Sequence, residues 1–198
     1  MSSSPTLDGV TWPRRTERLT IRPATAADLR AVFEIRTLAA VGQWMPSRPD
    51  SYEGFLLQHG KHDAMPRTLV IELDRVVIGD LYLHVTDPWA QAEVTDQVKD
   101  QQQAEIGWVL DPVHQGRGYV TEAMTELVRV CFEDLGVRRL TASAFNDNVP
   151  SLAVMERLGM RRETHGIRDS LHRDLGWVDS ATFALLVDEW RASQPTTG

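Results

Sequence analysis

The chain has 198 residues, of which 42% are hydrophobic and 25% charged, a composition typical of a globular protein long enough to bury its own core. The net charge of −7 argues against a nucleic-acid surface, and no apolar run is long enough to span a membrane. A single cysteine excludes an intrachain disulfide, and the first residues lack the pattern of a secretion signal, so we expect a cytoplasmic protein. The scattered histidines offer no ligand set at a fixed spacing, so we expect no metal.

The first half of the chain predicts one strand, two helices and a hairpin. In chain order these are a strand at Thr16–Pro23, a helix over about Ala26–Ala40, a second helix around Ser51–His59, and hairpin strands at 68–73 and 76–85 on either side of Asp74-Arg75. Thr25 is the predicted N-cap of the first helix, with Asp28 three residues further on. The polar, glutamine-rich stretch from Thr86 to Gln103 is expected to be a long loop.

The second half alternates strands with helices. The predicted elements are a strand at Glu105–Leu110, a helix from about Val120 that ends at Gly136, a strand at Arg138–Phe145, a helix that opens at Asn148 and ends at Leu158-Gly159, and a last strand near Thr182–Trp190. Asp111-Pro112 ends the first of these strands, because proline cannot donate to a ladder and restricts the residue before it.

A glycine-rich segment, Gln115–Val120, joins the Glu105 strand to the helix after it. Gly116 and Gly118 permit backbone conformations closed to other residues and carry no side chain that would block a ligand. The free N–H groups and the positive dipole end of the next helix would face this segment, which makes it a candidate anion site. A Walker loop would require Gly-Lys-Ser/Thr, and a dinucleotide fingerprint would require a glycine where Thr121 stands.

This segment resembles the acyl-CoA loop of the GNAT superfamily of N-acetyltransferases, whose pattern is Gln/Arg-x-x-Gly-x-Gly/Ala; Val120 stands where the pattern has a small residue. Three other segments resemble the same superfamily: Thr16–Leu29, Asn148–Ser151 and Leu158–Met160. The ending Gly176–Trp190 resembles its branch of ribosomal-protein N-terminal acetyltransferases. The resemblance implies a GNAT fold of the α/β (α+β) class, with a mixed central sheet of about six to seven strands flanked by helices. It also implies one domain over residues 14–191, between flexible tails at 1–13 and 192–198.

The implied chemistry is acyl transfer from a thioester to an amine, which needs a base and hydrogen-bond donors for an oxyanion. The resemblance makes Glu105 the general base, and partial burial would raise the pKa of such a carboxylate toward neutrality. The alternative is a structural glutamate paired with a cross-strand Arg or Lys. Ser151 is the candidate acid, and its alternative is an ordinary residue in the first turn of a helix. Cys131 is expected to be a buried structural cysteine, so transfer would be direct.

The implied acetyl-CoA-binding residues come from three segments. They are Trp108, Val109, Leu110, Gln115, Gly116, Arg117, Gly118, Tyr119, Val120, Asn148 and Ser151. The backbone N–H of Val109 would polarise the acetyl carbonyl, and Asn148 is also a good N-cap by its chemistry alone.

The function implied by the resemblance is acetyl transfer from acetyl-CoA to a primary amine, either a protein N-terminus or a small molecule. Two alternatives stay open: a non-catalytic acyl-CoA-binding or regulatory module, and an N-acyltransferase that uses a longer acyl donor. The acceptor would bind among Val41–Gly60, Thr86–Gln103 and Gly166–Trp177, where Trp44, Met45, Trp89 and Trp177 are candidates for its pocket. The oligomeric state, a homodimer included, stays open.

Overall fold

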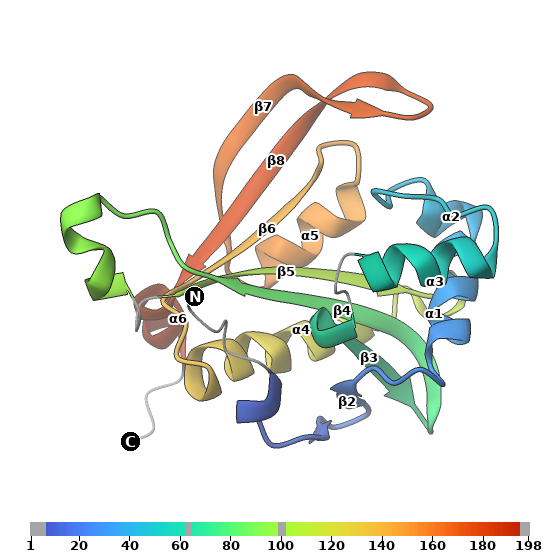
Figure 1. The fold of residues 1–198 in the computed structure, drawn as a ribbon, viewed down its shortest axis with the longest axis horizontal. Helices are drawn as coiled ribbons and strands as arrows, with labels where there is room; N and C mark the ends of the chain where they lie inside the picture. Colours follow the sequence, from blue (N-terminus) through green and yellow to red (C-terminus); the bar gives the residue numbers. More distant parts are fainter. Residues whose placement is uncertain (1–6, 62–64, 99–101, 195–198) are drawn as a thin grey trace. The chain divides into compact units, whose positions relative to one another are not determined.

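The computed structural model describes residues 7–61, 65–98 and 102–194 (Figure 1). The chain falls into two compact units. The N-unit lies within Thr6–Leu83 and Gly107–Leu127, and the C-unit lies within His84–Ile106 and from Val128 onward. Residues 1–6 and 195–198 of the predicted tails lie outside the described residues, whereas Leu7–Gly9 form a short 3-10 helix, η1.

The strands of the described chain form a mixed sheet. Hydrogen bonding joins them in the order β1-β2-β3-β4-β5-β6-β8-β7, with β5 and β6 parallel. The predicted class is therefore confirmed, with eight strands in the described residues rather than six or seven. None of the helices described is both long and apolar enough to cross a bilayer.

The N-unit holds the first strands and four α-helices. Its elements are β1 (Arg14–Arg15), β2 (Thr20–Pro23), α1 (Leu29–Thr37), α2 (Ala39–Gly42), α3 (Tyr52–Lys61), η2 (Met65–Arg67), β3 (Thr68–Leu73), most of β4 (Val76–Thr86), the end of β5 (Gln103–Leu110), η4 (Pro112–His114) and most of α4 (Tyr119–Arg129). The hairpin β3–β4 is confirmed. Its turn residues Asp74 and Arg75 have φ of 50° and 66°, the left-handed pair that a two-residue hairpin turn requires.

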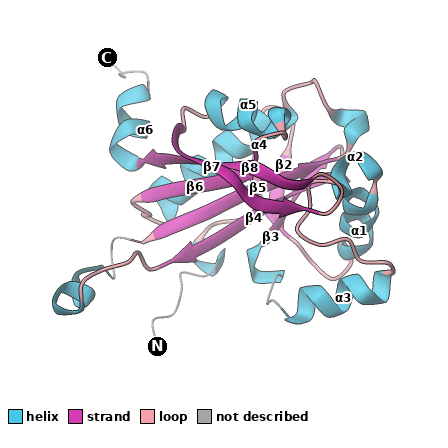
Figure 2. Cartoon of the chain, turned by 90° about the horizontal axis from the view of Figure 1, so that it is seen from above, coloured by secondary structure: helices cyan, strands magenta, loops and turns pink. Residues whose placement is uncertain are grey.

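The core of the N-unit is built on β3, whose first four residues are all buried. Helix α1 packs against α2 and α3 (Figure 2). Leu29 and Val32 of α1 and Phe55 of α3 form one buried cluster with Val70 of β3. Such a run of consecutive apolar residues is typical of a strand covered on both faces, which explains why no alternation marks β3 in the sequence.

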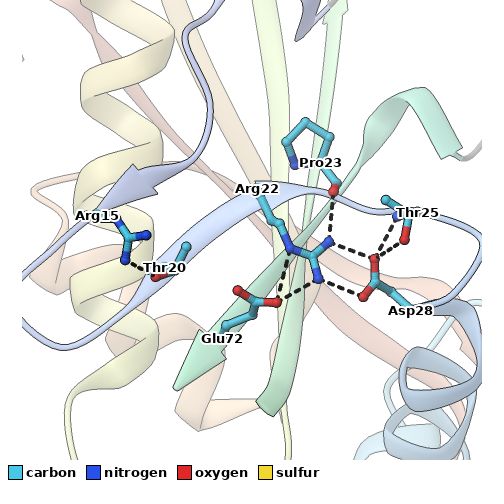
Figure 3. Close-up of polar contacts among 7 residues, drawn as sticks. All are labelled: Arg15, Thr20, Arg22, Pro23, Thr25, Asp28 and Glu72. Carbon is cyan, nitrogen blue, oxygen red and sulfur yellow. Dashed lines mark hydrogen bonds and ion pairs between the residues drawn. The ribbon is translucent and has the colours of Figure 1, made fainter. Parts of the chain in front are cut away.

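Arg22 of β2 ties the start of α1 to β3 (Figure 3). Its guanidinium donates to both carboxylate oxygens of Asp28, at 2.7 and 2.8 Å, and to Glu72 at 2.6 Å. The Asp28 carboxylate also accepts from the N–H and the hydroxyl of Thr25, each at 2.7 Å. The prediction of Thr25 as N-cap was therefore wrong: the Thr25 hydroxyl donates to Asp28 instead of accepting from the helix, which begins at Leu29 with Asp28 at the N-cap position.

The Arg22–Asp28 pair predicts a pH-dependent stability. The hydrogen bond from Arg22 lowers the pKa of Asp28 to about 2. The carboxylate therefore stabilises the fold above its unfolded-state pKa near 4, and this contribution, roughly 2 kcal/mol, is lost as the pH falls through about 2. We expect Asp28→Asn to lower the free energy of unfolding in urea at pH 7, with a difference from the wild type that shrinks below pH 4. A difference that is constant with pH would exclude this role, and Asp50→Asn, at an exposed aspartate, is the control.

The C-unit holds the second half of the sheet. Its elements are η3 (Ala92–Val98), the start of β5, a π-helical turn η5 (Val130–Asp134) that continues α4, β6 (Arg139–Phe145), α5 (Val149–Arg157), β7 (Arg161–His172), β8 (Gly176–Leu186) and α6 (Val187–Ser193). The predicted Thr86–Gln103 loop contains η3, and its residues 99–101 lie outside the described residues. The last predicted strand ends earlier than expected, at Leu186, where α6 begins.

Strand β7 was not predicted as a strand. It is the last strand in the hydrogen-bonding order, and His172 is its one buried residue, so it carries no apolar alternation to recognise. Arg161 at its start forms ion pairs of 2.6 Å with Glu163 of the same strand and with Glu189 of α6. Charged side chains on an edge strand discourage pairing with a further strand.

Candidate functional site

The glycine-rich segment 115–120 lies in the N-unit, where it follows η4 and runs into the first residues of α4. Asp111 starts η4: its carboxylate accepts from the Val113 N–H at 3.1 Å, and its own N–H donates to the Ile78 carbonyl at 2.9 Å. Gly116 and Gly118 are exposed and have φ of 74° and 79°, a left-handed conformation that favours glycine.

Space and donors are both present at this segment. A Cβ atom added to Gly116 would meet no atom within 4 Å. The first N–H groups of α4, which begins at Tyr119, have no acceptor within the helix. Arg117 is exposed and adds a positive charge. The segment thus has the backbone and the charge that an anionic ligand requires.

A residue that sequence reasoning did not assign to the site, Arg18, holds this segment. From the turn between β1 and β2, its Nη1 donates to the Arg117 carbonyl at 2.9 Å and its Nε donates to Glu122 at 2.7 Å. Its guanidinium lies 4.6 Å from the centre of the Tyr119 ring. Arg18 and Glu122 stand 104 positions apart, and no local pattern reports such a contact.

Glu122 is the counter-charge of Arg18. Its Oε1 accepts from the Thr16 hydroxyl and, at 2.9 Å, from the Arg18 N–H. Burial raises the pKa of Glu122, but the hydrogen bonds from Thr16 and Arg18 lower it by more, so the pKa falls below its ordinary value. The carboxylate is therefore held in its charged form.

At the end of β5, peptide groups rather than side chains are available to a ligand. Trp108 is half-buried, and Val109 and Leu110 are buried. Val109 packs in a cluster with Ile35 and Val41, against which Met45 lies. The side chains of Val109 and Leu110 therefore serve the core, and a ligand could use only their peptide groups.

Glu105 lies on β5 in the C-unit, opposite Thr141 of β6. It is exposed, whereas its neighbours Ala104 and Ile106 are buried, so Glu105 lacks the partial burial that would raise the pKa of a base. On the β6 side the residue opposite is a threonine, and Glu105 forms no ion pair with any of the described residues, which speaks against the alternative of a cross-strand ion pair.

Asn148 and Ser151 lie together at the start of α5 in the C-unit. The Asn148 side chain accepts from the Ser151 N–H at 3.4 Å, so the predicted N-cap is confirmed. Both residues are half-buried. Cys131 is fully buried, and burial raises the pKa of its thiol, which disfavours the thiolate that a nucleophile requires. The described residues hold no group of three or more His, Cys, Asp or Glu side chains arranged for a metal ion.

Comparison with known proteins identifies the class. Residues 18–161 match the family model described as acetyltransferase (GNAT) domain. The chain therefore belongs to the GNAT family, and it is an acetyltransferase.

Individual relatives agree with this class. YnaD, an uncharacterised N-acetyltransferase of Bacillus subtilis, is 25% identical over 178 residues, which cover 88% of this chain and 97% of the relative. A GNAT-family acetyltransferase from Bacillus anthracis has a similar structure, with a TM-score of 0.73, 26% identity and coverage of 89% and 99% of the two chains. Spermidine N-acetyltransferase from Vibrio cholerae, solved with CoA and spermine, shares the fold with a TM-score of 0.72, at 16% identity and coverage of 89% and 99%.

Proposed function

We propose that this enzyme transfers the acetyl group of acetyl-CoA directly to a primary amine, with Glu105 as the general base. The observation that carries the proposal is the state of Glu105: an exposed carboxylate with no ion-pair partner in the described chain, on the strand that leads into the glycine-rich segment. A carboxylate without a structural partner is available to accept a proton from a substrate.

The donor site of the proposal is the segment Gln115–Val120. Its support is the pair of left-handed glycines, the open space at Gly116 and the first-turn N–H groups of α4. Asn148 and Ser151 at the start of α5, together with the peptide groups of Trp108–Leu110, complete the set that we assign to acetyl-CoA. Acetyl-CoA, as the second substrate, supplies the thioester whose carbonyl carbon is attacked.

In the proposed reaction, Glu105 takes a proton from the substrate ammonium, directly or through water, which frees the nitrogen lone pair. A C–N bond forms to the acetyl carbon, and the C–S bond to CoA breaks. The Val109 N–H donates a hydrogen bond to the acetyl oxygen while it carries negative charge. Ser151 gives the CoA thiolate a proton and regains one from the nitrogen, which loses its second proton as the amide forms; Glu105 releases the first proton to solvent.

The proposed acceptor is a primary amine in the cytoplasm. The proposal includes two acceptor classes, small-molecule amines and protein N-termini. The V. cholerae neighbour is named for spermidine, and the sequence motifs resemble protein N-terminal acetyltransferases. Of the aromatic candidates for the acceptor pocket, Trp89 and Trp177 are largely exposed. Exposed indole rings are available to contact an organic cation.

An acceptor-panel assay tests this proposal. The enzyme and acetyl-CoA are mixed with peptides, polyamines, aminoglycosides or amino acids, and the released thiol is measured. We expect thiol release that depends on the amine for one acceptor class. Tight acetyl-CoA binding by calorimetry without thiol release from any member would favour the binding-module alternative. Faster release from longer acyl-CoA esters would favour the acyltransferase alternative.

A further inference from the structure

The Arg117–Gly118 peptide group has its orientation fixed by Arg18. The carbonyl of Arg117 accepts from Nη1 of Arg18 at 2.9 Å. In a planar trans peptide, the carbonyl oxygen and the following N–H point in opposite directions. Because the Arg117 carbonyl faces Arg18, the Gly118 N–H points away from Arg18 and makes no hydrogen bond to it.

The guanidinium of Arg18 is itself held on several sides. Nε and Nη2 donate to Oε2 of Glu122 at 2.7 and 2.6 Å, and the ring of Tyr119 lies against its face. Glu122 belongs to the first turn of α4, where its N–H donates to the Gly118 carbonyl at 3.0 Å. The peptide groups on both sides of Gly118 are thus anchored: Arg18 holds the Arg117 carbonyl, and the helix N–H of Glu122 holds the Gly118 carbonyl.

Charge gives Arg18 a second effect. The carboxylate of Glu122 lies in the first turn of α4, where an anionic ligand would otherwise meet a like charge. Arg18 neutralises this carboxylate through a forked pair of hydrogen bonds, which a lysine could not reproduce while also reaching the Arg117 carbonyl.

We infer that Arg18 is a positioning residue for the donor substrate: it orients the Arg117–Gly118 peptide so that the Gly118 N–H is presented to the pyrophosphate of acetyl-CoA. This inference rests on the proposed function of the segment Gln115–Val120. Arg18 acts through the peptide and contacts no reacting atom.

A double-mutant cycle separates orientation from charge. CoA affinity is measured by calorimetry for the wild type, Arg18→Ala, Glu122→Gln and the double variant. We expect Arg18→Ala to weaken binding about tenfold, or about 1.4 kcal/mol. Glu122→Gln removes the negative charge and should change affinity by less than about threefold. The double variant should stay about fivefold weaker than Glu122→Gln, because the peptide has lost its anchor.

Two readouts exclude a general loss of structure. Arg18→Ala should raise KM for acetyl-CoA while kcat at saturation changes by less than about twofold, since only binding is affected. In NMR spectra, the shift of the Gly118 amide proton on addition of CoA should shrink in this variant. Arg15→Ala is the matched control: Arg15 is an exposed arginine of β1 that donates to the Thr20 hydroxyl at 3.3 Å, and its loss should change neither quantity.

The outcomes are distinct. If the wild type binds CoA and Arg18→Ala binds it with the same affinity, the inference is overturned and the proposed function stands. A double variant that binds as tightly as Glu122→Gln also overturns it, because Arg18 would then act by charge alone. A wild-type protein that binds no CoA overturns the proposed function together with the inference. If Arg18→Ala fails to fold, Arg18→Lys, which keeps the charge but lacks the planar fork, should still weaken CoA binding.

Discussion

Replacing Glu105 with glutamine is expected to lower kcat/KM for acetyl transfer by about 10³-fold, because glutamine keeps the shape of the side chain but cannot accept a proton. Glu105 is exposed and makes no ion pair in the described chain, so the fold should tolerate the change. Affinity for acetyl-CoA should stay within about twofold, since the base contacts the amine rather than the donor. Steady-state thiol release with the best acceptor of the panel measures the first quantity, and calorimetry the second.

Glu156→Gln is the matched control for this variant. Glu156 is an exposed glutamate on α5, in the same unit, and has no part in the proposed chemistry. Its replacement should leave kcat/KM within about twofold of the wild type. If Glu105→Gln retains activity comparable to this control, another group is the base.

The second large effect is expected at Gly79, on β4. A Cβ atom added there would lie 2.3 Å from the Val109 carbonyl oxygen and 3.2 Å from the Leu110 Cα, so the two backbones would have to separate. We expect Gly79→Ala to lower the free energy of unfolding by about 3 kcal/mol, at the upper end of the usual cost of overpacking. Urea unfolding followed by circular dichroism measures this difference.

Gly79→Ala should also reduce activity in the molecules that remain folded, because displacing the Val109 carbonyl would shift the adjoining Val109 N–H, the proposed donor to the acetyl oxygen. Gly54→Ala is the control, and it is expected to change the stability in the opposite direction. Gly54 lies within α3, an added Cβ would approach Ser51 Oγ no closer than 3.4 Å, and alanine should stabilise the helix by about 0.5 kcal/mol. Equal stability of Gly79→Ala and the wild type would show that β4 can move away from Val109 without cost.

Local sequence patterns predicted much of the fold. Asp111-Pro112 ends a strand wherever it stands, paired left-handed residues at Asp74-Arg75 suit a tight hairpin, and Asn148 caps a helix through its own side chain. Each of these is decided within a few residues of chain. The strand that contains Glu105, the glycine segment and the helix after it were also predictable from local sequence.

The features that were missed had different causes: a competing hydrogen-bond network, exposure of a strand, and a contact between distant segments. Thr25 has the chemistry of an N-cap, but Arg22 and Thr25 itself bind Asp28, and the helix starts later. Strand β7 lacks apolar alternation because almost all of it is exposed. Arg18 stands in the recognised Thr-Glu-Arg-Leu segment, yet its hold on the glycine segment depends on Glu122, far along the chain.

The most direct test of the proposed chemistry is a single-turnover experiment with enzyme, stoichiometric acetyl-CoA and the amine that the panel selects, followed by mass spectrometry of every product. We predict one acetylated amine for each CoA thiol released and no acetylated protein at any time, since the Cys131 thiol is fully buried. An acetyl group that appears on the protein before it reaches the amine, or acetyl-CoA that stays intact, would contradict direct transfer by this enzyme.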